Sequence, residues 1–166
     1  MNKKPHLWID ADACPRKICE LAFRAAARRG LRVTLVANVW VPLPLMDNVT
    51  LVQVPTGADK ADDHLVAAVA PGELVVTADV PLSARLVEKG LTAVDLRGDE
   101  YTDATIGERK ATRDLMDALR GAGLATGGPA PFSAKDVKAF AAALDRYIVR
   151  AARIATTQEA NNGKGT

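Results

Sequence analysis

A regular alternation of short apolar runs with helical segments is the feature that most constrains what this chain can fold into. Five runs rich in Val, Leu and Ile occur before residue 97, and most are separated by segments whose apolar residues recur at helical spacing. Parallel strands need such crossovers, and strands buried on both faces are apolar throughout. The pattern therefore predicts an α/β fold: a three-layer sandwich with a mostly parallel five-stranded sheet. The expected strands are residues 7–10, 31–38, 48–54, 73–79 and 91–96.

Proline and glycine mark where the intervening helices begin and end. Pro15 suits a first helical turn because its missing N–H has no partner there, and Gly30 suits a helix C-cap. Residues 39–46 contain two prolines and are predicted to form an irregular loop. The expected helices in this part of the chain are residues 16–29, 62–70 and 81–90.

A more polar stretch follows the fifth expected strand. Within it, Thr105 and Glu108 have the spacing of a capping box, so they are expected to open a helix that ends near Gly121. Residues 121–132 are rich in Gly and Pro and are expected to form a turn region.

The end of the chain is predicted to hold one last helix and a tail. Ser133 and Asp136 are expected to cap a helix over residues 135–154, where apolar residues recur at helical spacing. Residues 1–154 would then form a single α/β domain, since no repeat or linker divides them. Residues 155–166 are polar and are expected to be disordered.

Composition excludes several classes of protein. The chain has 166 residues, 48% hydrophobic and 25% charged, with a formal net charge of +2, as in an ordinary soluble domain. No apolar run approaches the roughly 20 residues that cross a bilayer. The apolar stretch near the N-terminus is interrupted by Asp10, so it is not a signal peptide, and a cytoplasmic protein without a membrane partner is expected. Neither a dinucleotide-binding glycine motif nor a phosphate-binding P-loop is present.

The two cysteines do not form a recognised motif. Cys14 and Cys19 are five residues apart rather than in a C-x-x-C pair, and two distant histidines complete no zinc pattern. On a helix this spacing would put them on different faces. They are therefore predicted to be two small buried thiols without a redox role.

Carboxylates recur where the expected strands end or helices begin. Asp10 and Asp12 follow the first strand, and Asp79 ends the fourth strand. Between them, Asp59, Asp62 and Asp63 precede or open a helix. If strands one and four are neighbours, the strand order is 3-2-1-4-5 and these groups face one crevice beyond the carboxyl ends of the strands. Crowded carboxylates need a cation, and Mg²⁺ or Mn²⁺ takes oxygen ligands. Such a site suits phosphodiester hydrolysis.

Each candidate also has a simpler interpretation. Asp12 would serve as a helix N-cap, Asp62 and Asp63 are favoured at a helix N-terminus, and Asp79 fits a turn. Trp40, in the proline-containing loop, would either stack on a nucleic-acid base or pack the loop onto the core. The candidate substrate contacts are Arg16, Asn38, Lys60, Thr77 and Arg85.

Several motifs together resemble one family over residues 7 to about 150. They are "DADACP", "LVAN", "GADKADDHL", "VVTADVPLSARLVEKG", "TIGE" and "GGPAPFSAKD", and the family is the YaiI/YqxD family of uncharacterised bacterial proteins. That family is placed with PIN-like nuclease domains by fold similarity. The resemblance implies a parallel sheet of order 3-2-1-4-5 and acidic residues around Mg²⁺ or Mn²⁺.

The resemblance also assigns roles to individual residues. It implies that Asp10, beside Asp12, is the first-strand acid and that Asp62 or Asp63 is the mid-chain acid. Asp79 takes the place of the fourth-strand acid, with Thr77 as the hydroxyl residue before it. PIN-like domains often carry a further acid close by, where this chain has Pro81.

Three functions compete on these observations. The first is a metal-dependent nuclease acting on RNA or structured nucleic acid, and the second is a non-catalytic module that binds nucleic acid or protein. The third is an Asp-x-Asp phosphatase with a nucleophilic first Asp, but its acidic pair should follow the Thr77 strand rather than precede it. In the nuclease, the metal would be held by Asp10, Asp12, Asp62 and Asp79, with Asp63 as a further candidate.

Overall fold

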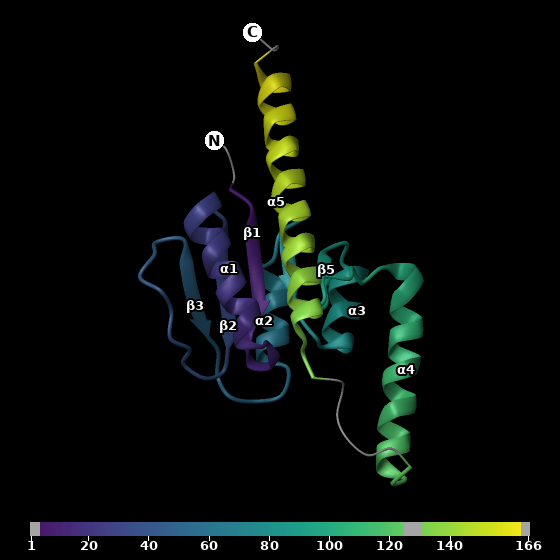
Figure 1. The fold of residues 1–166 in the computed structure, drawn as a ribbon. Helices are drawn as coiled ribbons and strands as arrows, with labels where there is room; N and C mark the ends of the chain where they lie inside the picture. The colour runs from purple at the N-terminus through teal and green to yellow at the C-terminus, as the bar shows by residue number, and fades with distance from the viewer. Residues whose placement is uncertain (1–3, 125–130, 164–166) are drawn as a thin grey trace.

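The computed structural model describes residues 4–124 and 131–163, and it has the predicted α/β architecture (Figure 1). Five strands pair in parallel to form one sheet of order β3-β2-β1-β4-β5, which confirms the predicted order. The strands are β1 (His6–Asp10), β2 (Arg32–Ala37), β3 (Val49–Gln53), β4 (Leu74–Val76) and β5 (Thr92–Val94).

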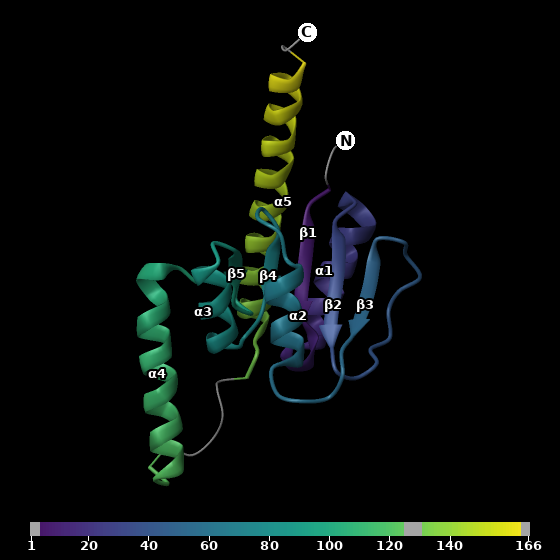
Figure 2. The ribbon, with the colours of Figure 1, turned by 180° about the vertical axis from the view of Figure 1, so that it is seen from behind.

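Helices cover both faces of the sheet, which is why the strands are apolar throughout. Along β1, Leu7 and Ile9 pack under α1 (Arg16–Arg29) and α5 (Ala134–Asn162) on one face. Trp8 points to the other face, where α2 (Lys60–Ala68) and α3 (Val80–Glu88) pack. Figures 1 and 2 show these two layers from opposite sides.

The ends of α1 follow the predicted signals. Pro15 is its N-cap, and Gly30 ends it in the left-handed region at φ 68°. A short 3₁₀ turn, η1 (Ala11–Ala13), joins β1 to this helix. The segment 39–46 contains no helix or strand, as its prolines predict.

Helix α4 (Asp103–Gly121) is capped differently from the prediction. Its N-cap is Thr102, which forms a reciprocal capping box with Thr105, so the expected box of Thr105 with Glu108 is wrong. The Thr105 hydroxyl fills the role that a Glu or Gln side chain usually has. The helix packs mainly against α3, buries none of its own residues, and projects away from the sheet (Figures 1 and 2).

Helix α5 starts as predicted and ends later. Ser133 and Asp136 form the expected capping box. The helix continues to Asn162, so residues 155–162 are helical where a disordered tail was expected. No Pro or Gly interrupts the sequence before Gly163, and helix-favouring residues such as Gln, Glu and Ala continue to that point. Residues 164–166 of the predicted tail, and residues 125–130 of the predicted turn region, lie outside the described residues.

A buried polar cluster closes the amino edge of the sheet. Glu73, just before β4, accepts hydrogen bonds from the Trp8 indole (2.8 Å) and the Ala70 backbone N–H (2.9 Å). The Nδ1 atom of His6 lies 3.4 Å from the other Glu73 oxygen. The Tyr147 hydroxyl lies 3.0 Å from the His6 carbonyl oxygen and so ties α5 to β1. The carboxylate of Glu73 is thereby surrounded by donors.

The described residues include no helix that is both long enough and apolar enough to span a membrane.

Candidate functional site

An open cavity of about 420 Å³ lies at the carboxyl edge of the sheet. Its position follows from the topology, because β1, β2 and β4 are parallel neighbours and end on the same side. Five carboxylates from three segments of the chain line it: Asp10, Asp12, Asp59, Asp62 and Asp79. We call this cavity and its lining the acidic cleft.

Asp10 is the deepest of these carboxylates. It is the last residue of β1 and is only 7% exposed. One of its oxygens accepts a hydrogen bond from the Thr77 hydroxyl at 2.8 Å. Burial raises the pKa of Asp10, the bond from Thr77 opposes this rise, and the charges of Asp79 and Asp12 add to it. Asp10 is therefore held in one orientation but disfavoured as an anion.

Thr77 positions two carboxyl groups at once. It is buried directly after β4, donates to Asp10, and accepts the backbone N–H of Asp79 at 3.0 Å. Thr77 does not itself line the cleft. The observed role of Thr77 is to orient Asp10, and its role as a substrate contact stays a prediction.

Asp79 is a helix cap as well as a cleft residue. It is the N-cap of α3, and its carboxylate accepts the backbone N–H of Leu82 at 3.0 Å. Asp79 is thus a helix N-cap with a side-chain hydrogen bond, which is more specific than the turn residue of the simpler interpretation. This bond fixes one oxygen, while the side chain still lines the cleft.

Asp12 does not cap α1, which corrects one of the simpler interpretations. Pro15 is the N-cap, and no side chain caps this helix. Both carboxylate oxygens of Asp12 instead lie 3.1 Å from the backbone nitrogen of Asn38, which donates to them. The bond joins η1 to the start of the loop after β2 and places Asn38 in the cleft lining.

Asp62 and Asp63 are consecutive residues of α2 and have different surroundings. Asp62 lines the cleft, and its pKa is raised to about 6 by partial burial and by the charges of Asp79, Asp10 and Asp59. Asp63 is exposed and forms an ion pair with Arg85 at 2.9 Å. Of the two predicted mid-chain acids, only Asp62 therefore reaches the cleft.

Of the three basic residues predicted to contact substrate, only some line the cleft. Lys60 lines the cleft. Arg85 is engaged by Asp63, and Arg16 is exposed and pairs with Glu20 along the surface of α1 at 3.2 Å. Neither of these arginines lines the cleft.

Two further charged residues, Asp59 and Arg113, line the cleft. Asp59 has a φ of 62°, and it is the one non-glycine residue with a positive φ in the described ranges. Such a conformation costs free energy and is concentrated at functional sites. Arg113 reaches the cleft from α4. Nothing in the sequence around Arg113 signals this, because α4 is placed by tertiary contacts.

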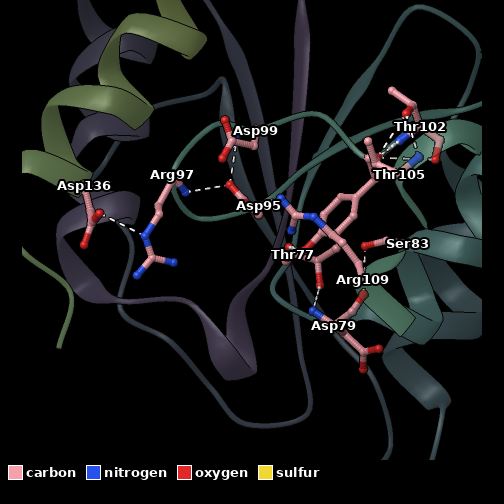
Figure 3. A network of polar contacts seen from close by, with 11 residues as sticks. Thr77, Asp79, Ser83, Asp95, Arg97, Asp99, Thr102, Thr105, Arg109 and Asp136 are labelled. Atoms are coloured by element: carbon pink, nitrogen blue, oxygen red, sulfur yellow. Dashed lines mark hydrogen bonds and ion pairs between the residues drawn. The ribbon is translucent and has the colours of Figure 1, made fainter. Parts of the chain in front are cut away.

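A polar network connects α4 to the cleft (Figure 3). The Tyr101 hydroxyl donates to the carbonyl oxygen of Thr77 at 3.1 Å. The Arg109 guanidinium lies 4.5 Å from the centroid of the Tyr101 ring and pairs with Asp95 at 2.7 Å. The N-terminal part of α4 is thus fixed against the segment that orients Asp10.

Cys19 lies in the core under α1 and Cys14 packs against the same core, contrary to the prediction that helical spacing puts them on different faces. Cys14 precedes α1 in an extended conformation, so helical spacing does not apply to the pair. The Cys14 Sγ donates to the Pro15 carbonyl oxygen at 3.7 Å. The neighbouring Cys19 thiol and burial raise the pKa of Cys14, whereas the Cys14 thiol lowers the pKa of Cys19. Both remain free thiols.

Trp40 does not pack onto the core. Its side chain is 70% exposed in the loop after β2, so the interpretation of Trp40 as an anchor of this loop is wrong.

The carboxylates are not arranged as a preformed multidentate metal centre. Across residues 4–124 and 131–163, no three acidic, His or Cys side chains converge closely enough to hold one ion. The donor set is nevertheless all oxygen, which is the chemistry of Mg²⁺ and Mn²⁺ sites. Mg²⁺ is commonly held by one or two carboxylates together with waters.

The fold and the cleft define a class of α/β protein with a five-stranded parallel sheet and an acidic cleft at its carboxyl edge. The model of the family described as "Uncharacterized BCR, YaiI/YqxD family" matches residues 8–150. The chain belongs to the YaiI/YqxD family, as its motifs predicted. The matched segment contains every cleft residue named above.

Bacterial relatives cover most of the chain. A UPF0178 protein of Xanthomonas oryzae pv. oryzae (strain PXO99A) is 52% identical over 146 residues, or 88% of this chain and 91% of the relative. A UPF0178 protein of Burkholderia vietnamiensis is 49% identical over 144 residues, or 87% and 96%. One from Aliivibrio fischeri (strain MJ11) is 47% identical over 145 residues, or 87% and 97%. No solved structure is significantly similar.

Proposed function

We propose that the acidic cleft binds Mg²⁺ or Mn²⁺ and hydrolyses phosphodiester bonds, with RNA or another structured nucleic acid as the favoured substrate. One observation carries the proposal: carboxylates from three segments line one open cavity, and their charges help to raise the pKa of Asp62 to about 6. Such repulsion is relieved by a bound cation. The resemblance to PIN-like nuclease domains supports the same assignment.

Asp10 and Asp62 are the carboxylates that would hold the cation directly. The charge of Asp10 is one of those that raise the pKa of Asp62, so the two groups are electrostatically close. Asp12 and Asp79 each accept backbone N–H bonds, which suits them to hold metal-bound waters instead. When bound, the cation would polarise the phosphoryl group and activate a water.

The remaining lining residues would position the substrate. Lys60 and Arg113 place positive charge on the border of an otherwise negative cleft, where a phosphate group would lie. Thr77 keeps Asp10 in one orientation through its hydroxyl. Asn38 adds an amide beside Asp12, whose carboxylate accepts the Asn38 backbone N–H.

The test combines calorimetry with a cleavage assay. We expect the wild type to bind Mn²⁺ and to cleave labelled RNA in Mg²⁺ or Mn²⁺. Asp10→Asn and Asp62→Asn should each weaken Mn²⁺ binding by about tenfold or more and abolish cleavage. Asp63→Asn is the matched control, because Asp63 is adjacent on α2 but outside the cleft. Equal Mn²⁺ binding by the wild type and Asp62→Asn, or no cation-dependent cleavage, would contradict the proposal.

A non-catalytic nucleic-acid or protein-binding module is the second candidate. It is favoured by the structural use of two carboxylates, since Asp79 caps α3 and Asp12 holds the loop at Asn38. In that case RNA or protein binding would be independent of divalent cations and unchanged in Asp62→Asn. The Asp-x-Asp phosphatase is less well supported, because its second Asp, here Asp12, is engaged by a backbone N–H rather than free to transfer a proton.

A further inference from the structure

We propose that the outward side of α1 binds the phosphate backbone of a nucleic-acid strand that continues from the acidic cleft. Three side chains of α1 form this surface, which we call the basic stripe: Lys17, Arg24 and Arg28. The choice of nucleic acid as the partner rests on the proposed function. The stripe itself is defined by the charge, the exposure and the position of α1.

Helix α1 concentrates positive charge in a chain that is nearly neutral. Its 14 residues include five Lys or Arg and one Glu, which gives the helix a net charge of +4. The whole chain has a net charge of only +2, so the rest of the chain is net negative. A local excess of one sign attracts the opposite charge even where the total is small.

Two of the five basic side chains are engaged within the protein. Arg16 pairs with Glu20 along the surface of α1. Arg29 pairs with Asp145 and so fastens α1 to α5. These two arginines therefore have a structural partner already.

The three side chains of the basic stripe have no such partner. Lys17, Arg24 and Arg28 are exposed, and in the described ranges 4–124 and 131–163 their side chains form no hydrogen bond or ion pair. Binding a phosphate would thus break no existing contact of these cations.

The basic stripe lies on the side of α1 that faces away from the core. Ile18 and Ala22 are buried on the inner side, whereas spacings of seven and four residues align the stripe on the outer side. From its first to its last residue the stripe rises about 16 Å along the helix. One strand of a duplex carries a phosphate about every 3.4 Å, so about five phosphates span this length. Each of the three cations can therefore reach its own phosphate.

One end of the basic stripe borders the acidic cleft. Asp12 and Ala13 line the cleft, and Lys17 is four residues after Ala13. Helix α1 then runs beside α5 from the carboxyl edge of the sheet to the amino edge (Figure 1). A strand with one phosphate at the cleft would therefore continue along α1 with its next phosphates against the stripe.

An anionic membrane is the other extended negative surface that such a stripe would meet. A helix that binds a membrane by lying in its surface inserts its apolar side. In α1 that side is occupied, because Ile18, Ala22 and Ala26 are buried in the core. The continuity of the stripe with the cleft therefore favours nucleic acid.

The test is RNA binding by the full chain without divalent cations. A fluorescently labelled single-stranded RNA is titrated in EDTA, and its anisotropy gives the dissociation constant at a series of salt concentrations. We expect Arg24→Gln combined with Arg28→Gln to weaken binding at low salt by about tenfold or more. The slope of log affinity against log salt should become shallower by about 1.4, because each lost contact to a single strand accounts for about 0.7. Both side chains are exposed, so the variant should fold as the wild type does.

A charge-matched variant separates the basic stripe from net charge alone. Arg120→Gln combined with Arg153→Gln removes two exposed arginines from α4 and α5 and should leave RNA binding nearly unchanged. Equal weakening by both double variants, no RNA binding by the wild type, or binding to phosphatidylserine vesicles without binding to RNA would each overturn the proposal.

The absence of metal in this experiment keeps its result distinct from that of the cleavage assay. RNA binding that depends on Arg24 and Arg28, together with no cleavage in Mg²⁺ or Mn²⁺, would support the basic stripe and contradict only the hydrolysis proposed for the cleft. Cleavage by the wild type that the Arg24→Gln and Arg28→Gln double variant retains with an unchanged KM would overturn the stripe and leave the hydrolysis.

Discussion

Two equally buried carboxylates, one at each edge of the sheet, have opposite surroundings. Glu73 at the amino edge and Asp10 at the carboxyl edge are each 7% exposed. Glu73 accepts bonds from the Trp8 indole and the Ala70 N–H and lies beside His6. Asp10 accepts one bond from Thr77 and otherwise faces other acids.

The difference separates stability from function. A buried carboxylate surrounded by donors stabilises the fold, because removing it leaves those donors unpaired. A carboxylate among like charges destabilises the fold unless something else neutralises it. The amino edge is therefore expected to be sensitive to mutation, and the carboxyl edge to gain stability when a charge is removed.

Removing the carboxylate of the amino edge should have the largest effect. Glu73→Ala leaves the buried Trp8 indole N–H and the Ala70 N–H without their acceptor. We expect the free energy of unfolding to fall by about 3 kcal/mol, measured by urea denaturation. Glu88→Ala, at an exposed position on α3, is the control and should be nearly neutral. Equal stability of the two variants would remove the contrast between the edges.

The two buried tyrosines allow a matched comparison between the edges. The Tyr147 hydroxyl lies within hydrogen-bond distance of the His6 and Gly72 carbonyl oxygens, whereas the Tyr101 hydroxyl donates to the Thr77 carbonyl oxygen. We expect Tyr147→Phe to cost about 2 kcal/mol and Tyr101→Phe about 1 kcal/mol in the same denaturation experiment. The reverse order would mean that the network around α4 stabilises the fold more than the amino edge does.

Removing a charge from the acidic cleft should stabilise the protein. The pKa of Asp62 rises from 3.8 to about 6 on folding. Its contribution to the free energy of unfolding is therefore fully present below pH 3.8 and is lost as the pH rises through about 6. Asp62→Asn should therefore raise the free energy of unfolding by about 1 kcal/mol at pH 7.5, a value reduced by solvent screening of a half-exposed group. At pH 3.5 it should have little effect.

Measurement of Asp62→Asn should be made by denaturation without divalent cations, because a bound cation would hide the effect. A variant that is less stable than the wild type at pH 7.5, or equally stabilised at both pH values, would contradict the repulsion inferred for the cleft.

The surface pair beside the cleft should matter least. Arg85→Ala breaks the ion pair with Asp63, in which both side chains are exposed. We expect a change below about 0.5 kcal/mol in the unfolding free energy. A larger loss would show that Arg85 reduces repulsion within the cleft, since it also lowers the pKa of Asp62.

Much of the fold could be predicted because local signals and tertiary structure agree. Apolar runs separated by crossovers specify parallel strands, and Gly30 ends α1 where a left-handed residue is needed. The errors lie where several residues satisfy one rule. Thr102 and Thr105 both suit an N-cap, and the sequence does not say which is used. The end of α5 lacks a terminating residue until Gly163.

The candidate site could be predicted only in part. Strand ends are set by topology, so Asp10 and Asp79 could be placed at one edge. The choice between Asp62 and Asp63 depends on the rotation of α2, which their adjacency in sequence leaves open. Arg113 depends on how Tyr101 and Arg109 fix α4, and this is a matter of tertiary packing.

The length and direction of α5 make the protein convenient to attach to a surface. Its 29 residues span about 44 Å at a rise of about 1.5 Å per residue. Figure 1 shows the helix running from the carboxyl edge past the amino edge, so its last turns stand away from the acidic cleft. A linker or fluorophore joined near Asn162 would leave the cleft open to solution. Cation and nucleic-acid binding can therefore be followed on an immobilised or labelled chain.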